Sequence, residues 1–265
     1  MTDSATIRIR SQESRSIKIQ DTSHASIQTE DYISWIKEQL EQHREPEFQM
    51  FTSRLLPGVE NILGVRLPKL RELARQAAKM DAESFLHRMK EAARELDAYY
   101  EEKMLYGLVI GYAKMDDAAR RQWLDAFVPV IDNWGVCDSC CMTYKWMKKQ
   151  PEYWWAYVND WTFSGTEYGV RFALVSMLAH FVDEAHLGDI LTICGQLSEE
   201  GYYAKMAQAW LVSMCFVKFP EQTFAFLQTD EMDSFTHNKS IQKTCESYRV
   251  DQAWKERLRA LRRKS

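Results

Sequence analysis

The sequence predicts an all-α fold, and two observations carry that prediction. Gly and Pro are scarce, with 10 and 6 residues that together make up near 6% of the 265, about half of their usual share of roughly 12%. Sandwiches, barrels and nucleotide-binding α/β folds need these residues in many turns, so they are disfavoured. From residue 31 onward, apolar residues recur with the period of a helix in segment after segment.

The expected helices follow one another with short breaks. In chain order they cover residues 32–43, 48–56, 68–79, 82–93, 101–114, 118–131, 134–149, 152–161, 167–182, 187–197, 202–219, 221–227, 235–247 and 252–263. The signals that separate them are Pro57-Gly58, Asp81, Asp116-Asp117, Asn133, Pro151, Ser164-Gly165, Gly201, Pro220 and Asp233. Pro68, Pro151 and Pro220 suit the first turn of a helix, where the missing N–H costs nothing.

Helix pairs recur at intervals of roughly 33 to 40 residues, and this period is typical of an α-solenoid. We therefore expect a HEAT-like α-solenoid, an ARM-type superhelix of about six to seven stacked helix pairs with a concave face. Residues 30–265 would form this single domain. No self-similarity of sequence is obvious, and a compact orthogonal helical bundle is the alternative.

The ends and the overall composition add little about function. Residues 1–29 are rich in Ser, Thr and Gln without helical periodicity, which predicts a disordered extension or a short strand pair. No uncharged run is long enough to span a membrane. The six cysteines lie in apolar helical patterns, so reduced, buried thiols in a cytosolic protein are expected. A net charge of −4 neither supports nor excludes a nucleic-acid partner.

Several kinds of chemistry leave no motif in this chain. A Gly-rich phosphate loop, HExxH and GxSxG are all absent. Cys137-x-x-Cys140-Cys141 is the one metal-like cluster, and zinc would need two further ligands at suitable spacing.

Trp134 and Asp138 form the first suggestive pair. Their i, i+4 spacing near the start of a helix puts both side chains on one face. A carboxylate beside an indole can hold a cation between its charge and the ring face. The alternative is that Asp138 caps the helix or pairs with Lys145, while Trp134 fills the core.

Arg171 and Trp210 are the next candidates. Arg171 is a full charge in the apolar run 168–182, so it faces a groove, a ligand or a partner carboxylate in a buried ion pair. Trp210 lies on a stripe of apolar residues that is normally core.

The C-terminal segment is strongly basic. Residues 239–264 contain nine Lys or Arg against three acidic residues. Lys239 and Lys243 are one turn apart on one helix, a spacing that can contact adjacent phosphates. A solvated tail is the alternative for residues 255–264.

Together these residues resemble the AlkD-like family of DNA alkylation-repair glycosylases, which are HEAT-like α-solenoids. The resemblance covers about residues 31–264 and depends on the order of four segments more than on any one of them. The segments are Asn133-Trp134-Gly135-Val136-Cys137-Asp138-Ser139, Tyr168-Gly169-Val170-Arg171-Phe172, Tyr203-Ala204-Lys205-Met206-Ala207-Gln208-Ala209-Trp210 and Asn238-Lys239-Ser240-Ile241-Gln242-Lys243.

The resemblance implies roles for individual residues. Asp138 would be the catalytic carboxylate, with Trp134 and Trp210 as aromatic walls of the cleft. Arg171 would hold the backbone phosphate of the lesion nucleotide. Lys205, Lys239 and Lys243 would contact the DNA backbone on a concave DNA-binding face.

The resemblance also implies an activity. It is hydrolysis of the N-glycosidic bond of cationic alkylated purines, such as N3-methyladenine and N7-methylguanine, in duplex DNA without base flipping. No metal or cofactor is implied. A monomer in the cytoplasm, in the bacterial cytosol or nucleoid, would be expected. The alternative is a non-catalytic HEAT-like module that binds DNA structures or protein partners.

Overall fold

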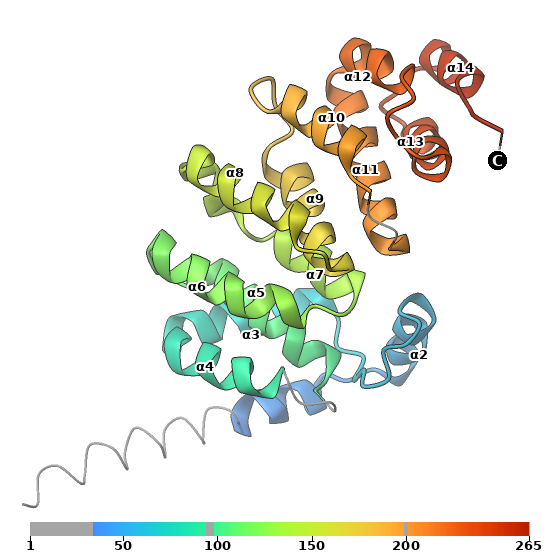
Figure 1. Ribbon diagram of the computed structural model, residues 1–265. Helices are drawn as coiled ribbons and strands as arrows, with labels where there is room; N and C mark the ends of the chain where they lie inside the picture. Colours follow the sequence, from blue (N-terminus) through green and yellow to red (C-terminus); the bar gives the residue numbers. More distant parts are fainter. Residues whose placement is uncertain (1–33, 94–97, 199–200, 265) are drawn as a thin grey trace, which may run out of the picture.

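The computed structural model describes residues 34–93, 98–198 and 201–264, and every regular element within them is a helix (Figure 1). The arrangement is that of an α-solenoid, because the helices stack in the order of the chain. The expected extension at residues 1–29 lies outside the described part. Within that part, no helix combines the length and apolar character needed to cross a membrane.

Alternate helices form a continuous row. The members, which we call the row helices, are α3 (Leu67–Met80), α5 (Tyr100–Tyr112), α7 (Trp134–Cys141), α9 (Glu167–His180), α11 (Tyr202–Lys218) and α13 (Ser234–Glu246). Each packs against the next one, from α3 to α13. Their first residues are 32 to 35 positions apart, so equivalent turns of neighbouring row helices lie side by side.

The remaining helices precede, separate or follow the members of the row in the chain. They are residues 34–42, α2 (Pro46–Leu55), α4 (Ala82–Ala92), α6 (Asp117–Phe127), α8 (Pro151–Asp160), α10 (Leu187–Gln196), α12 (Pro220–Leu227) and α14 (Gln252–Ala260). Short 3-10 turns follow three of the helices: η1 (Val128–Val130), η2 (Lys145–Lys149) and η3 (Trp161–Phe163). From α4 onward, nearly all these helices pack on one or two row helices, whereas α2 stands to one side (Figure 1).

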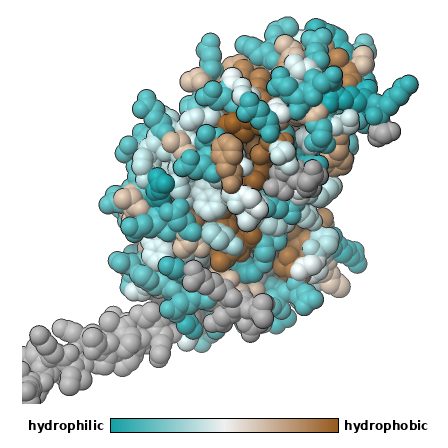
Figure 2. Space-filling model, in the orientation of Figure 1, coloured by the Kyte–Doolittle hydropathy of each residue, from teal (hydrophilic) through white to brown (hydrophobic). Residues whose placement is uncertain are grey.

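A helix that neighbours cover on several sides differs in sequence from a helix with an exposed face. In α9, residues 169–178 and His180 are all buried, because neighbours cover the helix on several sides. In α6, Leu124 and Phe127 are buried while Arg121 and Gln122 are exposed, as expected for an amphipathic surface helix. In the space-filling view, hydrophilic residues cover most of the face, and apolar residues gather over α9 and α10 (Figure 2).

Polar residues at the predicted breaks begin the helices. The side chains of Asp81, Asp116, Asn133 and Asp233 each accept a hydrogen bond from a backbone N–H in the first turn that follows. Such caps satisfy donors that the helix itself leaves unpaired. The prolines at 68, 151 and 220 occupy first turns, which confirms that prediction.

One expected helix is wrong. The segment 134–149 was expected to be a single helix, but α7 ends at Cys141 and the chain turns before η2. Thr143 bonds back to the Ser139 carbonyl (2.9 Å), and the Tyr144 hydroxyl donates to the Gly107 carbonyl (3.2 Å). Burying the Tyr144 ring requires this turn. It also takes Lys145 off the helical face that carries Trp134 and Asp138.

A buried carboxylate joins the connection before α3 to α5. Glu101 is 1% exposed and accepts hydrogen bonds from the backbone N–H groups of Leu63 (3.0 Å), Gly64 (2.8 Å) and Val65 (3.1 Å). Burial raises the pKa of Glu101, although these hydrogen bonds oppose the rise. The carboxylate therefore supplies acceptors that a loop buried at this point would otherwise lack.

Replacing Glu101 with Ala is expected to lower the free energy of unfolding by about 3 kcal/mol or more. Three buried N–H groups would lose their acceptor, at about 1 kcal/mol each by the lower estimate. Urea unfolding measures the change. Glu91→Ala is the control, because in the described part of the chain exposed Glu91 forms an ion pair with exposed Arg88, and its loss should cost less than about 1 kcal/mol. Equal losses in the two variants would contradict the anchoring role.

Candidate functional site

The site begins at the first turn of α7. The side chain of Asn133, itself 2% exposed, accepts a hydrogen bond from the Val136 N–H (2.9 Å) and so fixes where the helix starts. Trp134 and Asp138 are then one turn apart on the same face, as their spacing predicts. Both side chains are partly exposed.

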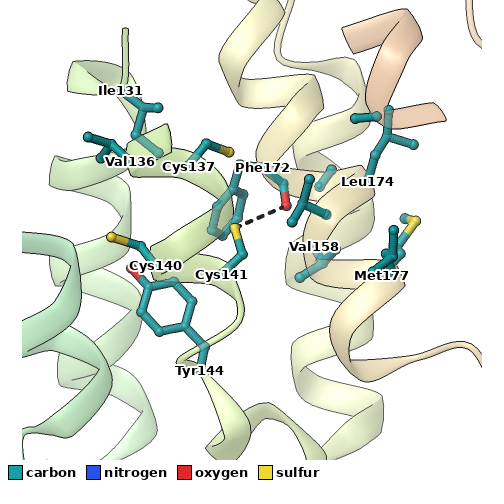
Figure 3. Close-up of a cluster of buried hydrophobic side chains, with 14 of the residues drawn as sticks. Ile131, Val136, Cys137, Cys140, Cys141, Tyr144, Val158, Phe172, Leu174 and Met177 are labelled. Atoms are coloured by element: carbon teal, nitrogen blue, oxygen red, sulfur yellow. Dashed lines mark hydrogen bonds between the residues drawn. The ribbon is translucent and has the colours of Figure 1, made fainter. Parts of the chain in front are cut away.

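Buried side chains of α7 anchor the helix in the core (Figure 3). The thiols of Cys140 and Cys141 donate to the carbonyls of Met104 on α5 and Phe172 on α9, at 3.7 and 3.8 Å. Burial raises the pKa of Cys137 and Cys140, so these thiols stay neutral. Wedged between α5 and α9, α7 holds the side chain of Asp138 on a fixed side of the row.

An ion pair between Asp138 and Arg171 joins α7 to α9. Arg171 donates from Nε to Oδ1 (2.9 Å) and from Nη2 to Oδ2 (2.8 Å), which is the bidentate geometry of an ionised pair. The two side chains are 17% and 7% exposed. Nη1 of Arg171 also donates to the Tyr203 carbonyl on α11 (2.5 Å). Of the alternatives that the sequence left open, the partner of Asp138 is Arg171 and not Lys145.

Burial and charge act in opposite directions on this pair. Burial raises the pKa of Asp138, while hydrogen bonds from Arg171 and the charges of Arg171 and Lys243 oppose the rise. Burial alone would lower the pKa of Arg171, but Asp138 reverses the sign and raises it. We take the pair as ionised, because two short hydrogen bonds of this geometry require a carboxylate acceptor.

The pair retains hydrogen-bonding capacity. A guanidinium carries five N–H donors and a carboxylate about four lone-pair sites. Three donors of Arg171 are used, by Asp138 and Tyr203. Counting bonds to the described residues, Arg171 keeps two N–H groups for an anion, and each oxygen of Asp138 keeps a lone pair for a water or a cation.

Three residues to which the sequence analysis gave no role position Arg171. Glu167 accepts a hydrogen bond from the Tyr203 N–H (2.5 Å), and the Tyr168 and Tyr203 rings stack with centroids 5.9 Å apart. These contacts hold the Tyr203 carbonyl where Arg171 reaches it. A signal was present in the sequence, because Glu167 is four residues before Arg171 and thus on the same helical face.

The two tryptophans lie on different helices. The indole Nε1–H of Trp134 donates to the Leu55 carbonyl at the end of α2 (3.1 Å), a partner that the sequence analysis missed. Trp210 lies on α11, half-buried against the core. It is seven residues, or two helical turns, from Tyr203 and so shares its face. In the described residues, no hydrogen bond joins Trp210 to Asp138.

The predicted DNA-contacting lysines continue from Arg171 along the row. Arg171, Lys205 and Lys239 are 34 residues apart and occupy equivalent turns of α9, α11 and α13. Lys205 is 4.0 Å from a carboxylate oxygen of Asp233. Lys239 donates to Gln242 (3.0 Å) and lies over the Phe235 ring. Burial lowers the pKa of Lys243, which lies close enough to Asp138 and Arg171 to interact with both charges.

A family comparison agrees with this arrangement. The sequence model of the family described as DNA alkylation repair enzyme matches residues 36–244. The chain belongs to this family. The match begins in the helix before α2 and ends within α13, so it contains Asp138, Arg171 and both tryptophans. A search of curated proteins gave no match.

In this member of the DNA alkylation repair family, a second contact besides the Asp138–Arg171 pair joins α7 to α9, at the C-terminal ends of the two helices. His180, at the end of α9, donates from Nε2 to the Cys141 carbonyl at the end of α7 (2.8 Å). Its Nδ1 is buried without a hydrogen-bond partner. Burial lowers the pKa of His180 to about 4, and the nearby charges of Lys148 and Lys145 also lower it. The ring is therefore neutral in the folded protein.

Acidification is expected to destabilise the protein through His180. Its pKa is lower in the folded state than in the unfolded state, so the stabilisation is complete above about pH 6.5 and is lost as the pH falls toward 4. The shift from 6.5 to about 4 corresponds to roughly 3 kcal/mol. Urea unfolding of wild type and His180→Gln at several pH values measures it. The wild type should lose more stability between pH 7 and 4 than the variant, and parallel curves would rule this role out.

Proposed function

We propose that this protein is a DNA glycosylase that hydrolyses the N-glycosidic bond of cationic alkylated purines, such as N3-methyladenine and N7-methylguanine, in duplex DNA. The observation that carries the proposal is a partly exposed carboxylate, Asp138, that an arginine holds in place while both retain hydrogen-bonding capacity. Trp134 stands one turn away, and a line of basic residues continues along the row.

Hydrolysis of a cationic nucleotide requires a carboxylate but no second residue that protonates the leaving base. Alkylation gives the purine a positive charge, so the base can leave with the electron pair of the glycosidic bond and become neutral. Positive charge then develops on the deoxyribose, as in glycoside hydrolysis. Water adds to C1′ and gives up a proton. No metal or protonated acid is required for the base to leave.

Asp138 would stabilise the charge that develops on the sugar. A carboxylate about 4 Å from a unit positive charge contributes roughly 4 kcal/mol at an effective dielectric constant near 20. Arg171 neutralises part of the negative charge of Asp138. The stabilisation of the sugar cation therefore depends on the sugar lying beside the free lone pairs of the carboxylate. A difference of even 3 kcal/mol between ground state and transition state corresponds to about a hundredfold in rate. The same lone pairs can orient the attacking water.

Arg171 would hold the backbone phosphate next to the lesion. Its two remaining N–H groups can donate to phosphate oxygens, while Asp138 and Tyr203 fix the direction of the guanidinium. Lys205, Lys239 and Lys243 would contact further phosphates. We propose that the side of the row carrying these residues is the concave DNA-binding face of a HEAT-like solenoid, and that one copy of the chain suffices.

The indoles would select for cationic nucleotides. The face of an indole attracts a cation more strongly than a neutral base of the same shape. The hydrogen bond from Trp134 to α2 fixes the orientation of one ring. Trp210 would form the opposite wall, two turns along α11 from Tyr203. A shallow site of this kind requires no flipping of the base from the helix.

Asp138→Asn is expected to lower the release of 7-methylguanine from methylated duplex DNA by at least about a hundredfold, because the charge that stabilises the sugar cation is gone. Fold and DNA binding should persist, since Asn is isosteric, its side-chain oxygen can still accept from Arg171, and Arg171 keeps the Tyr203 carbonyl as an acceptor. Circular dichroism checks that the buried charge of Arg171 has not unfolded the variant. Chromatography of the released bases measures the rate. Exposed Asp189 on α10 provides the control variant Asp189→Asn.

Two results would contradict the proposal. Unchanged base release by Asp138→Asn would remove this carboxylate from the mechanism. Absence of release by a folded, DNA-binding wild type would instead favour the non-catalytic DNA-binding module.

Replacing Arg171 alone would leave Asp138 as an unpaired, partly buried charge and destabilise the fold. The test of Arg171 therefore uses a variant in which Asp138 is already neutral. In the Asp138→Asn background, adding Arg171→Met should weaken duplex binding and reduce the slope of log K against log salt by about one. Fluorescence anisotropy at several salt concentrations measures the slope. Arg88→Met on α4 in the same background is the control. An unaltered slope would make Arg171 a purely structural partner of Asp138.

A further inference from the structure

A basic pocket lies next to the candidate site but contains none of its residues. It has a volume of about 530 Å³ and opens where the end of α5, the end of α7 and η2 meet α3 and α6. Five cationic residues line it: Arg71, Lys114, Arg120, Lys145 and Lys149. They come from α3, α6, η2 and the segment after α5, so only the tertiary structure brings them together.

Little negative charge offsets these cations. No acidic residue lines the pocket in the described part of the chain. Arg120 forms an ion pair with Asp117 (3.1 Å). Among the described residues, the other four cations form no ion pair. Five positive charges around one hollow repel each other, and an anion bound between them would relieve that repulsion.

Buried donors in the lining also lack acceptors. Nε of Arg71, Nε of Arg120 and Nε1 of Trp146 are buried without a hydrogen-bond partner. Trp146 is 93% buried, since 7% of its surface is exposed, and the Arg120 guanidinium lies 4.9 Å from its ring centroid. These atoms are enclosed by protein, so the groups that a ligand in the hollow would contact are the exposed ammonium groups of Lys145 and Lys149.

The dipoles of neighbouring helices explain only part of the cluster. Lys114 and Lys145 follow the ends of α5 and α7, where a positive charge is favourable. Arg71 is in the second turn of α3 and Arg120 in the second turn of α6. Their convergence on the same hollow has no such cause.

We propose that this pocket binds a phosphate group. A phosphate offers several strong acceptor oxygens and a charge that matches the lining. Met142 lines the pocket and is one turn beyond Asp138 on α7, so the hollow continues the face of the candidate site. A DNA duplex bound at the candidate site would therefore bring a backbone phosphate to the pocket. DNA as the source of the phosphate rests on the proposed function, whereas a free phosphate compound as the source does not.

Lys145→Gln combined with Lys149→Gln tests the pocket, since both lysines are exposed and their replacement should not disturb the fold. Binding of an undamaged duplex is measured between 50 and 200 mM salt, so that no base release is involved. One phosphate contact contributes a slope of about −0.9, and the double variant should therefore lose about three- to fourfold less affinity over this range than the wild type. Arg88→Gln with Lys90→Gln on α4, which does not border the pocket, is the charge-matched control.

A second measurement separates the two sources of phosphate. Isothermal titration of the protein with inorganic phosphate, without DNA, is compared for the wild type and the double variant. A smaller salt dependence in the double variant assigns the pocket to the DNA backbone. Phosphate binding that the double variant loses, with an unchanged salt dependence, assigns it to a free phosphate compound. If the double variant matches the wild type and the control in both measurements, the pocket binds no phosphate.

Discussion

Arg171 carries a full charge on a helix whose other buried residues are almost all apolar, and such a charge is tolerated only when it is paired and hydrogen-bonded. Asp138 supplies the countercharge and the Tyr203 carbonyl supplies a further acceptor. Because the three residues belong to α7, α9 and α11, one guanidinium fixes three consecutive row helices relative to each other. A well-packed apolar pair could be as stable, so stability alone does not account for these charges.

Cationic residues recur along the row although the protein as a whole is acidic. The net charge is −4, yet Lys103, Arg171, Lys205 and Lys239 occupy corresponding turns of α5, α9, α11 and α13. In α7 the acidic residue Asp138 takes the corresponding place. A solenoid turns such a spacing along the chain into a line in space, since each row helix packs on the next. Local potential, and not net charge, governs binding to a polyanion.

Much of the fold could be predicted because helix formation has strong local signals. Asp81, Asn133 and Asp233 mark helix starts since their side chains accept from the first-turn N–H groups that follow. The end of α7 could not be predicted, because it depends on a contact with α5: the Tyr144 hydroxyl finds the Gly107 carbonyl, 37 residues away. The same limit left the partner of Asp138 open between Lys145 and other residues.

By itself, the sequence determined most of the helices, their spacing and the residue types of the candidate site, because periodicity, caps and i, i+4 relations are local properties of the chain. It also matches the DNA alkylation repair family over residues 36–244. Only the tertiary structure decided that Arg171 bonds to Asp138 and Tyr203, that Trp134 reaches α2, and that cations from α3, α6, η2 and the segment after α5 converge. The physical reason is that burial and charge pairing depend on distances between helices, which no local pattern specifies.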